Sequence, residues 1–117
     1  MCFETTKYSK PKRAEKDISC WKLLNVDYTP LYHRTNPPYE SGVLNPIIKL
    51  KKVLGDWLYS IYEGYHSYRV EEEAIYCADE LFAVGNTKTL VKEFIIPKGT
   101  LYYKNKEEYV SETIIMK

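Results

Sequence analysis

The sequence predicts an α+β fold in which a mostly antiparallel sheet of about five or six strands carries one main amphipathic helix on one face. Two observations lead to this prediction. Residues 71–84 repeat apolar side chains at helical spacing, and three runs rich in β-branched and aromatic residues follow them. Because 117 residues suffice for one core, we expect a single α+β domain over residues 17–117.

Residues 1–16 differ from the rest of the chain in composition. They carry five basic and two acidic residues around Pro11, with almost no apolar periodicity. Such a segment is typical of a flexible or strap-like N-terminal arm. A basic arm can contact phosphates, but 17 basic against 16 acidic residues give the chain almost no net charge. We therefore do not expect nucleic acid to be the partner.

Two strands are expected in the first third of the chain. Residues 17–25 (DISCWKLLN) alternate side chains between two faces, which predicts a first strand. Residues 28–34 predict a shorter strand. Asn36-Pro37-Pro38 ends it, because proline donates no ladder hydrogen bond and restricts the residue before it.

Residues 45–63 are compatible with a helix or with a hairpin. Asn45 and Pro46 are good first residues of a helix, and apolar residues follow at helical spacing. Gly55-Asp56 instead fits a two-residue hairpin turn, and glycine costs an interior helix about 1 kcal/mol. We expect a short helical turn first and a strand from about Trp57.

The helix over residues 71–84 has signals at both ends. Glu71, Glu72 and Glu73 place negative charge where the helix dipole favours it, and Gly85-Asn86 supplies a C-terminal stop. Its apolar stripe, which should lie across the sheet, comprises Val70, Ala74, Cys77, Ala78 and Leu81.

Three strands are expected after the helix, over residues 89–96, 101–104 and 109–116. Pro97-Lys98-Gly99 separates the first two. Proline followed by lysine and by a glycine that can take positive φ favours a turn that closes on a bulge. The N–H groups of such a turn, with Lys98, can also bind an anion, but the turn alone explains these residues.

Composition points to the cytoplasm. The first sixteen residues are polar and lack a secretory signal, and no apolar run is long enough to span a membrane. Cys2, Cys20 and Cys77 are an odd number without a CxxC pair, which fits reduced thiols rather than a disulfide framework. We expect a cytoplasmic protein without a membrane partner.

The sequence contains no complete catalytic or metal-binding motif. His33 and His66 stand in no metal-ligand spacing, and the five glycines are scattered singly, so we expect no metal and no phosphate loop. A Cys–His pair could form in space, but Cys20 and Cys77 occupy apolar positions typical of inert core residues. An enzyme is thus the less favoured class.

Tyrosine is over-represented, with twelve residues against three Phe and two Trp. Its ring suits half-buried strand positions and also suits binding surfaces, so the tyrosines can be core or surface residues. The segment around Gly64 combines aromatic and cationic side chains. The predicted binding residues are Tyr65, His66, Tyr68 and Arg69, together with Lys98.

Three segments resemble small proteins of phages and gut bacteria to which no function is assigned. They are DISCWKLL, EGYHSYRVEEEA and the ending VKEFIIPKGTLYY…EYVSETIIMK, behind an opening Met-Cys. The resemblance covers most of the chain and implies a phage or mobile-element protein without implying an activity.

A more distant resemblance is to ADP-ribosyltransferases. Matched to their pattern, His33 or Arg34 would contact NAD, Ser67 would be the strand hydroxyl, and Glu107 or Glu108 would be the catalytic carboxylate. The chain lacks the family's Ser-Thr-Ser motif, has no Glu-x-Glu at Glu107 and Glu108, and is short for a complete NAD cleft.

These observations predict a non-enzymatic binding or accessory protein that uses no cofactor. Its partner would be a macromolecule or a small molecule. An ADP-ribosyltransferase-like enzyme or a nucleotide-binding domain is the alternative, in which NAD would bind. A homo-oligomer is a further possibility, because Ile114 and Met116 could supply an exposed strand edge.

Overall fold

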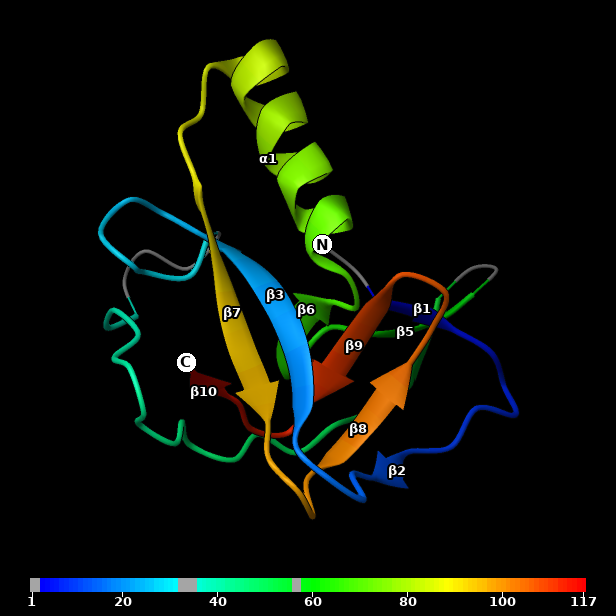
Figure 1. The fold of residues 1–117 in the computed structure, drawn as a ribbon. Coiled ribbons are helices and arrows are strands. Elements are labelled where there is room, and N and C mark those ends of the chain that lie inside the picture. Colours follow the sequence, from blue (N-terminus) through cyan, green and yellow to red (C-terminus); the bar gives the residue numbers. More distant parts are fainter. Residues whose placement is uncertain (1–2, 32–35, 56–57) are drawn as a thin grey trace.

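Figure 1 shows the fold of the computed structural model, which describes residues 3–31, 36–55 and 58–117. These residues form two antiparallel sheets and one helix, α1 (Glu71–Gly85). The three-stranded sheet has the order β1 (Phe3–Thr5), β5 (Tyr59–Ile61), β4 (Val53–Leu54). The seven-stranded sheet has the order β10 (Ile115–Met116), β7 (Leu90–Ile96), β3 (Ile18–Leu24), β6 (Tyr65–Tyr68), β9 (Glu108–Ser111), β8 (Leu101–Lys104), β2 (Lys12–Arg13). The predicted α+β class is confirmed.

The seven-stranded sheet is continuous except between two of its central strands. β3 pairs with β7 over seven residues, and β6 pairs with β9 over four. β3 and β6, by contrast, share the single pair Trp21–Tyr68, at the C-terminal end of β6. The sheet therefore consists of two parts, β10-β7-β3 and β6-β9-β8-β2, that are joined at one pair of residues.

Both faces of the sheet carry apolar side chains. Alternation along β3 places Leu24 in one cluster, with Phe94, and Leu23 in another, with Tyr68 and Ala74 under α1. The sheet is therefore covered by apolar clusters on both faces of β3.

The predicted helix is confirmed, and its two ends are packed differently. It ends at Asn86, which has a left-handed conformation (φ 52°) and donates its N–H to the carbonyl of Phe82. Its buried residue is Ala74, whereas Phe82 and Val84 are 52% and 90% exposed. The C-terminal end of α1 rises clear of the sheet in Figure 1. The apolar stripe thus packs on the sheet from Ala74 to Leu81, and the helix leaves the sheet beyond Leu81.

Residues 3–16 take part in both sheets. β1 pairs with β5, and Phe3 is fully buried in a cluster with Ile61. β2 pairs with β8, and the N–H of Ala14 then donates to the carbonyl of Thr100 at 2.9 Å. The segment expected to be a flexible or strap-like arm contributes one strand to each sheet.

The predicted number of strands is too low, since the sheets of the described residues contain three and seven strands. Part of the difference lies in residues 109–116, which form two strands instead of one. Glu112 and Thr113 redirect the chain between them, because the Glu112 carboxylate accepts from the N–H of Leu101 and the Thr113 hydroxyl donates to the carbonyl of Asn45.

The strand expected over residues 28–34 is wrong for the part that the structure describes. Residues 28–31 form a tight loop, in which the side-chain amide of Asn25 donates to the Thr29 hydroxyl and to the Pro30 carbonyl. Tyr28 has a positive φ of 69°, which interrupts an extended strand. Residues 32–35 lie outside the described residues.

The helical turn expected after Asn45 is also wrong. The segment 45–52 contains no helix, because its N–H groups find partners in the C-terminal segment instead of four residues back along the chain. The N–H of Asn45 donates to the carbonyl of Ile114 and that of Ile48 to the carbonyl of Glu112. Tertiary hydrogen bonding therefore overrides the local helical signals.

The hairpin alternative agrees with the structure in its two paired strands, but Gly55 is bonded to Leu58 and is not a central residue of a two-residue turn. β4 and β5 are antiparallel neighbours, and the N–H of Gly55 donates to the carbonyl of Leu58 at 2.9 Å. The strand expected from about Trp57 is β5, which starts at Tyr59. Asp56 and Trp57 lie outside the described residues.

We predict that Gly64→Ala is strongly destabilising. Gly64 precedes β6 with φ 118°, and an added Cβ would lie 2.6 Å from a methyl group of Leu50 and 2.8 Å from one of Val110. Backbone strain and steric overlap together should lower the free energy of unfolding by about 2–4 kcal/mol.

The matched control is Gly42→Ala. Gly42 also has positive φ (75°), but an added Cβ would meet no atom within 4 Å. Only the backbone term should remain, about 1–2 kcal/mol. Urea unfolding of both variants measures the difference, and equal losses would contradict the packing of Gly64 against Leu50 and Val110.

Candidate functional site

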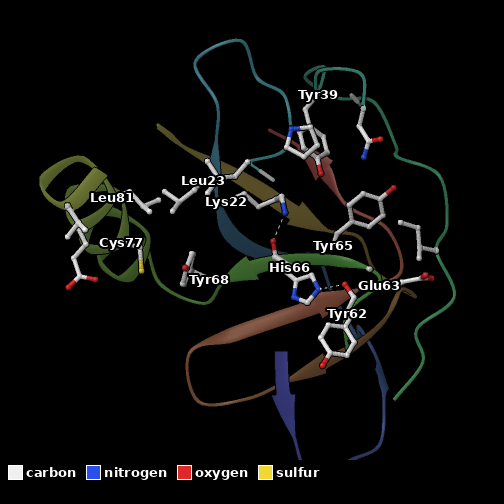
Figure 2. A pocket seen from close by; sticks show the side chains of 17 residues that line it. Lys22, Leu23, Tyr39, Tyr62, Glu63, Tyr65, His66, Tyr68, Cys77 and Leu81 are labelled. Atoms are coloured by element: carbon white, nitrogen blue, oxygen red, sulfur yellow. Dashed lines mark hydrogen bonds between the residues drawn. The ribbon is translucent and has the colours of Figure 1, made fainter. Parts of the chain in front are cut away.

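A groove with a cavity volume of about 910 Å³ opens beside the junction of β3 and β6. Figure 2 shows its lining, to which β3, β6 and α1 each contribute side chains. This volume falls within the range of small-molecule sites, about 300–1,000 Å³. The groove is therefore the candidate functional site.

The walls of the groove are largely apolar. On one side Leu23 of β3 and Tyr68 of β6 meet Cys77 and Leu81 of α1 (Figure 2). On another side lie Tyr39, Tyr65 and Ile48. The first of these walls is the cluster that holds α1 on the sheet, so the stability of the helix and the shape of the groove depend on the same packing.

Lys22 bridges the two parts of the sheet. Its Nζ donates to the main-chain carbonyl of His66 at 2.5 Å, next to the Trp21–Tyr68 pair (Figure 2). A side-chain amine thus links β3 to β6 just beyond their last ladder pair. Burial lowers the pKa of Lys22 to about 8, and the neighbouring Cys20 thiolate would oppose this shift.

Tyr39 and Tyr65 flank the Lys22 amine (Figure 2). The amine lies 6.0 Å from the ring centroid of Tyr39, which itself packs edge-on against Phe94. The Tyr65 hydroxyl donates to the carbonyl of Pro46 at 2.7 Å. Burial raises the pKa of both phenols, and in Tyr39 the proximity of Tyr65 adds to the shift, so both stay neutral near pH 7.

His66 connects the groove to the turn that precedes β6. Its Nε2 lies 3.0 Å from the carbonyl oxygen of Tyr62 (Figure 2). A hydrogen bond at this distance requires that Nε2 carries the proton. The imidazole is then held against residues 62–64, at the mouth of the groove that Tyr62 and Glu63 also line.

The predicted binding residues do not all lie together. Tyr65, His66 and Tyr68 line the groove. Arg69 points elsewhere, because its guanidinium donates to the carbonyls of Asn105 and Lys106 and lies 6.0 Å from the Tyr109 ring. Tyr68 is 7% exposed and belongs to the core beneath α1 as well as to the wall.

Lys98 lies in the turn between β7 and β8, where the N–H groups already have partners. That of Lys98 donates to the Asp17 carboxylate at 2.9 Å, that of Gly99 to the Ala14 carbonyl, and that of Thr100 to the Pro97 carbonyl. Gly99 has φ 89°, as the predicted turn requires. These bonds favour the turn over the anion site at Pro97-Lys98-Gly99.

The residues matched to ADP-ribosyltransferases are not brought to one cleft. Ser67 is opposite Tyr109, and Glu108 is opposite Tyr68. Because neighbouring residues of a strand point to opposite faces, Ser67 and Glu108 lie on different faces of the sheet. Glu107 is exposed in the β8–β9 turn. His33 and Arg34 lie outside the described residues.

The two described cysteines differ in environment. Cys20 is fully buried, and burial raises the pKa of its thiol to about 11. Cys77 is half-buried and lines the groove. Among the residues that the structure describes, no group of three or more His, Cys, Asp and Glu side chains could hold a metal ion. None of their helices is long and apolar enough to cross a membrane.

The edge proposed for self-association is covered. Ile114 is fully buried and Met116 is 4% exposed. The carbonyl of Ile114 accepts from the N–H of Asn45, and that of Met116 from the N–H of Gly42. The C-terminal segment is therefore hydrogen-bonded to residues 41–45 on its outer side.

Lys22, Tyr39 and Leu81 line the groove but were not among the site residues predicted from the sequence. The available signal was the position of Lys22, which is in phase with Cys20 and Leu24 on the inward face of an apolar strand. A lysine at such a position needs a polar partner inside the protein. Tyr39 had no local signal, because only the folded chain carries it to β3.

No family model, curated protein or solved structure matches this chain.

We predict that Glu108 makes the stability of the protein depend on pH. Burial, and next the charge of Glu107, raises the pKa of Glu108 to about 7 from its usual 4.5. The folded state therefore binds more protons between these values, so the free energy of unfolding falls as the pH rises through about 7. At about pH 8, Glu108→Gln should be more stable than the parent by about 1–3 kcal/mol.

Glu40→Gln is the control, because Glu40 is exposed and its charge is not among those that shift the pKa of Glu108, so the pH profile should change much less. Unfolding by urea at a series of pH values from about 5 to 8 compares the three proteins. Parallel profiles for the parent and Glu108→Gln would contradict the assigned environment of Glu108.

Proposed function

We propose that this protein is a binding protein that takes up a small organic molecule in the groove between β3, β6 and α1. The observation that carries the proposal is a cavity of about 910 Å³ with largely apolar and aromatic walls and a few polar groups inside. Such a combination is the usual character of a ligand pocket. An apolar body would bind against Leu23, Leu81 and the tyrosine rings.

The hydrogen bonds of the polar groups support binding by a preformed site. Lys22, Tyr65 and His66 each interact with a backbone carbonyl, of His66, Pro46 and Tyr62 respectively. These bonds hold the side chains in place before a ligand arrives. A site whose groups are already ordered loses less conformational entropy on binding, which increases affinity.

The position of the groove also supports the proposal. It lies where the sheet is held by the single pair Trp21–Tyr68, so a ligand that contacts β3 and β6 would add contacts between the two parts of the sheet. Ligand binding to the folded state stabilises it by mass action, by about 2.7 kcal/mol at a hundred times the dissociation constant. Binding should therefore be visible as a rise in melting temperature.

We predict that a thermal-shift screen of aromatic and aliphatic small molecules, nucleotides and NAD identifies ligands that raise the melting temperature by several degrees. Cys77→Trp, which places an indole in the groove, should abolish the shift. Ile75→Trp is the matched control, because Ile75 is 44% exposed on the same helix and does not line the groove.

Labelling of Cys77 gives an independent measurement of occupancy. Cys77 is half-buried in the groove wall, so a bound ligand should slow its alkylation by a maleimide, as followed by peptide mass spectrometry. Buried Cys20 is the internal reference. A ligand that binds elsewhere would raise the melting temperature of Cys77→Trp as much as that of the parent protein. It would also leave the labelling rate of Cys77 in the parent unchanged. These two results together would contradict the proposal.

A further inference from the structure

Lys22 brings a positive charge into the groove, and no carboxylate of the described residues forms an ion pair with it. Within the described ranges, the one ion pair joins Lys117 to Glu93. The single hydrogen-bond acceptor of the Lys22 ammonium there is the His66 carbonyl. An ammonium group carries further N–H donors, and buried charges in proteins are normally paired.

The Lys22 amine is directed toward the groove. In Figure 2 its nitrogen points toward the side of the groove that Tyr39 and Tyr65 line, and it donates to the His66 carbonyl. All of these groups line the groove. The carboxylates that line it, Glu63 and Glu80, are both solvent-exposed and neither forms an ion pair with Lys22.

The protonation of Lys22 agrees with this geometry. Burial lowers its pKa to about 8, so the amine is desolvated but still mostly protonated at pH 7. An anion at this position would supply the electrostatic stabilisation that the amine lost on leaving water. Lys92, opposite Lys22 in the β3–β7 ladder, adds positive potential to the same region.

The charge and the donors fit a carboxylate better than a phosphate. Phosphate sites typically combine several cationic groups or a helix N-terminus with backbone N–H donors. Among the described residues that line the groove, Lys22 is the one lysine or arginine, and its amine lies 6.0 Å from the ring centroid of Tyr39. The first turn of α1 carries Glu71, Glu72 and Glu73. A single negative charge on an apolar body matches these surroundings.

We propose that the groove selects carboxylic acids with an aromatic or aliphatic body, and that Lys22 binds the carboxylate. This inference rests on the proposed function. The carboxylate would accept from Lys22 Nζ, and the body would lie against Tyr39, Tyr65 and Ile48, the wall on the same side of β3 as Lys22. Lys22 is thereby the residue that determines specificity.

Calorimetric titration with matched pairs of probes tests the inference. The probes are benzoate, naphthoate, phenylbutanoate and dodecanoate, each beside its neutral primary amide. At about pH 7 the acids should bind at least about tenfold more tightly than their amides, a typical effect of a charge-assisted hydrogen bond. Lys22→Met should remove the preference for the acid and leave the affinity for the amide nearly unchanged.

Two further variants keep the test independent of folding. Lys22→Arg retains the charge and should retain most of the preference for acids. Lys104→Met removes an exposed lysine on β8 that does not line the groove, and it should behave as the parent protein. Circular dichroism verifies that each variant is folded.

The pH dependence provides a second measurement. Above about pH 8 the affinity for the acids should fall, by up to about tenfold per pH unit, because free Lys22 loses its proton, while the affinity for the amides stays constant. In the part of the chain that the structure describes, the other titratable groups that face the groove are Tyr39, Tyr62, Glu63, Tyr65, His66, Tyr68, Cys77 and Glu80, with Lys92 nearby. In Lys22→Met the fall above pH 8 should disappear if Lys22 is its source.

The outcomes separate the two proposals. Equal binding of acids and amides, or an acid preference that persists in Lys22→Met, would overturn the role of Lys22 and leave the groove as a binding site. Binding of neither acids nor amides, with no shift in the wider thermal screen, would overturn both.

Discussion

The structure depends on the single ladder pair between β3 and β6. All other neighbouring strands of the seven-stranded sheet are joined by at least two ladder pairs. β3 and β6 are joined only by the pair Trp21–Tyr68. Two consequences follow from this constraint. The strands diverge and leave a groove, and the two parts of the sheet must be held together by side chains, among them Lys22, the neighbouring core and the start of α1. The feature that weakens the sheet locally is also the one that creates the candidate site.

The elements around the groove are held in place by contacts between distant segments of the chain. Residues 39–48 are bound to the C-terminal segment by hydrogen bonds from the N–H groups of Asn45 and Ile48. In this segment Tyr39 packs against Phe94. Gly64 lets the chain pass close to Leu50 and Val110 just before β6 begins. Contacts between segments far apart in sequence thus hold the groove walls in position. A rigid frame of this kind favours recognition by a preformed site, which is the basis of the proposed function.

Capping residues and hydrophobic patterns predicted correctly those elements that form from interactions between residues near in sequence. The helix at 71–84 has acidic residues in its first turn and Asn86 at its end, and it forms as expected. β3, β7 and β8 also follow their alternating patterns. The conformation of residues 45–52 was not predicted correctly, because it depends on hydrogen bonds to residues 112–114. These partners are brought close only when the chain folds. The same holds for residues 109–116, where side-chain bonds of Glu112 and Thr113 divide one apparent strand into two.

The candidate site was predictable only in part. The aromatic cluster at Tyr65, His66 and Tyr68 was visible in the sequence, and these residues line the groove. Lys22 and Tyr39 were not identified, since their proximity depends on how β3 and β6 separate, which is a property of strand pairing over long range. Ser67 and Glu108 illustrate the opposite error. The resemblance to ADP-ribosyltransferases placed these two residues in one site, but the pleat of the sheet places them on opposite faces.

The most direct test of the central claim is a two-dimensional ¹⁵N–¹H NMR titration of the labelled protein with a ligand from the thermal screen. The account predicts that the largest amide shift changes occur on both sides of the groove, at Lys22 and Leu23, at Tyr65 and His66, and at Cys77 to Leu81. Amides of β2 and β4, which do not line the groove, should change little. Shift changes confined to residues outside the groove would show that the separation of β3 and β6 is not the binding site and would contradict the account.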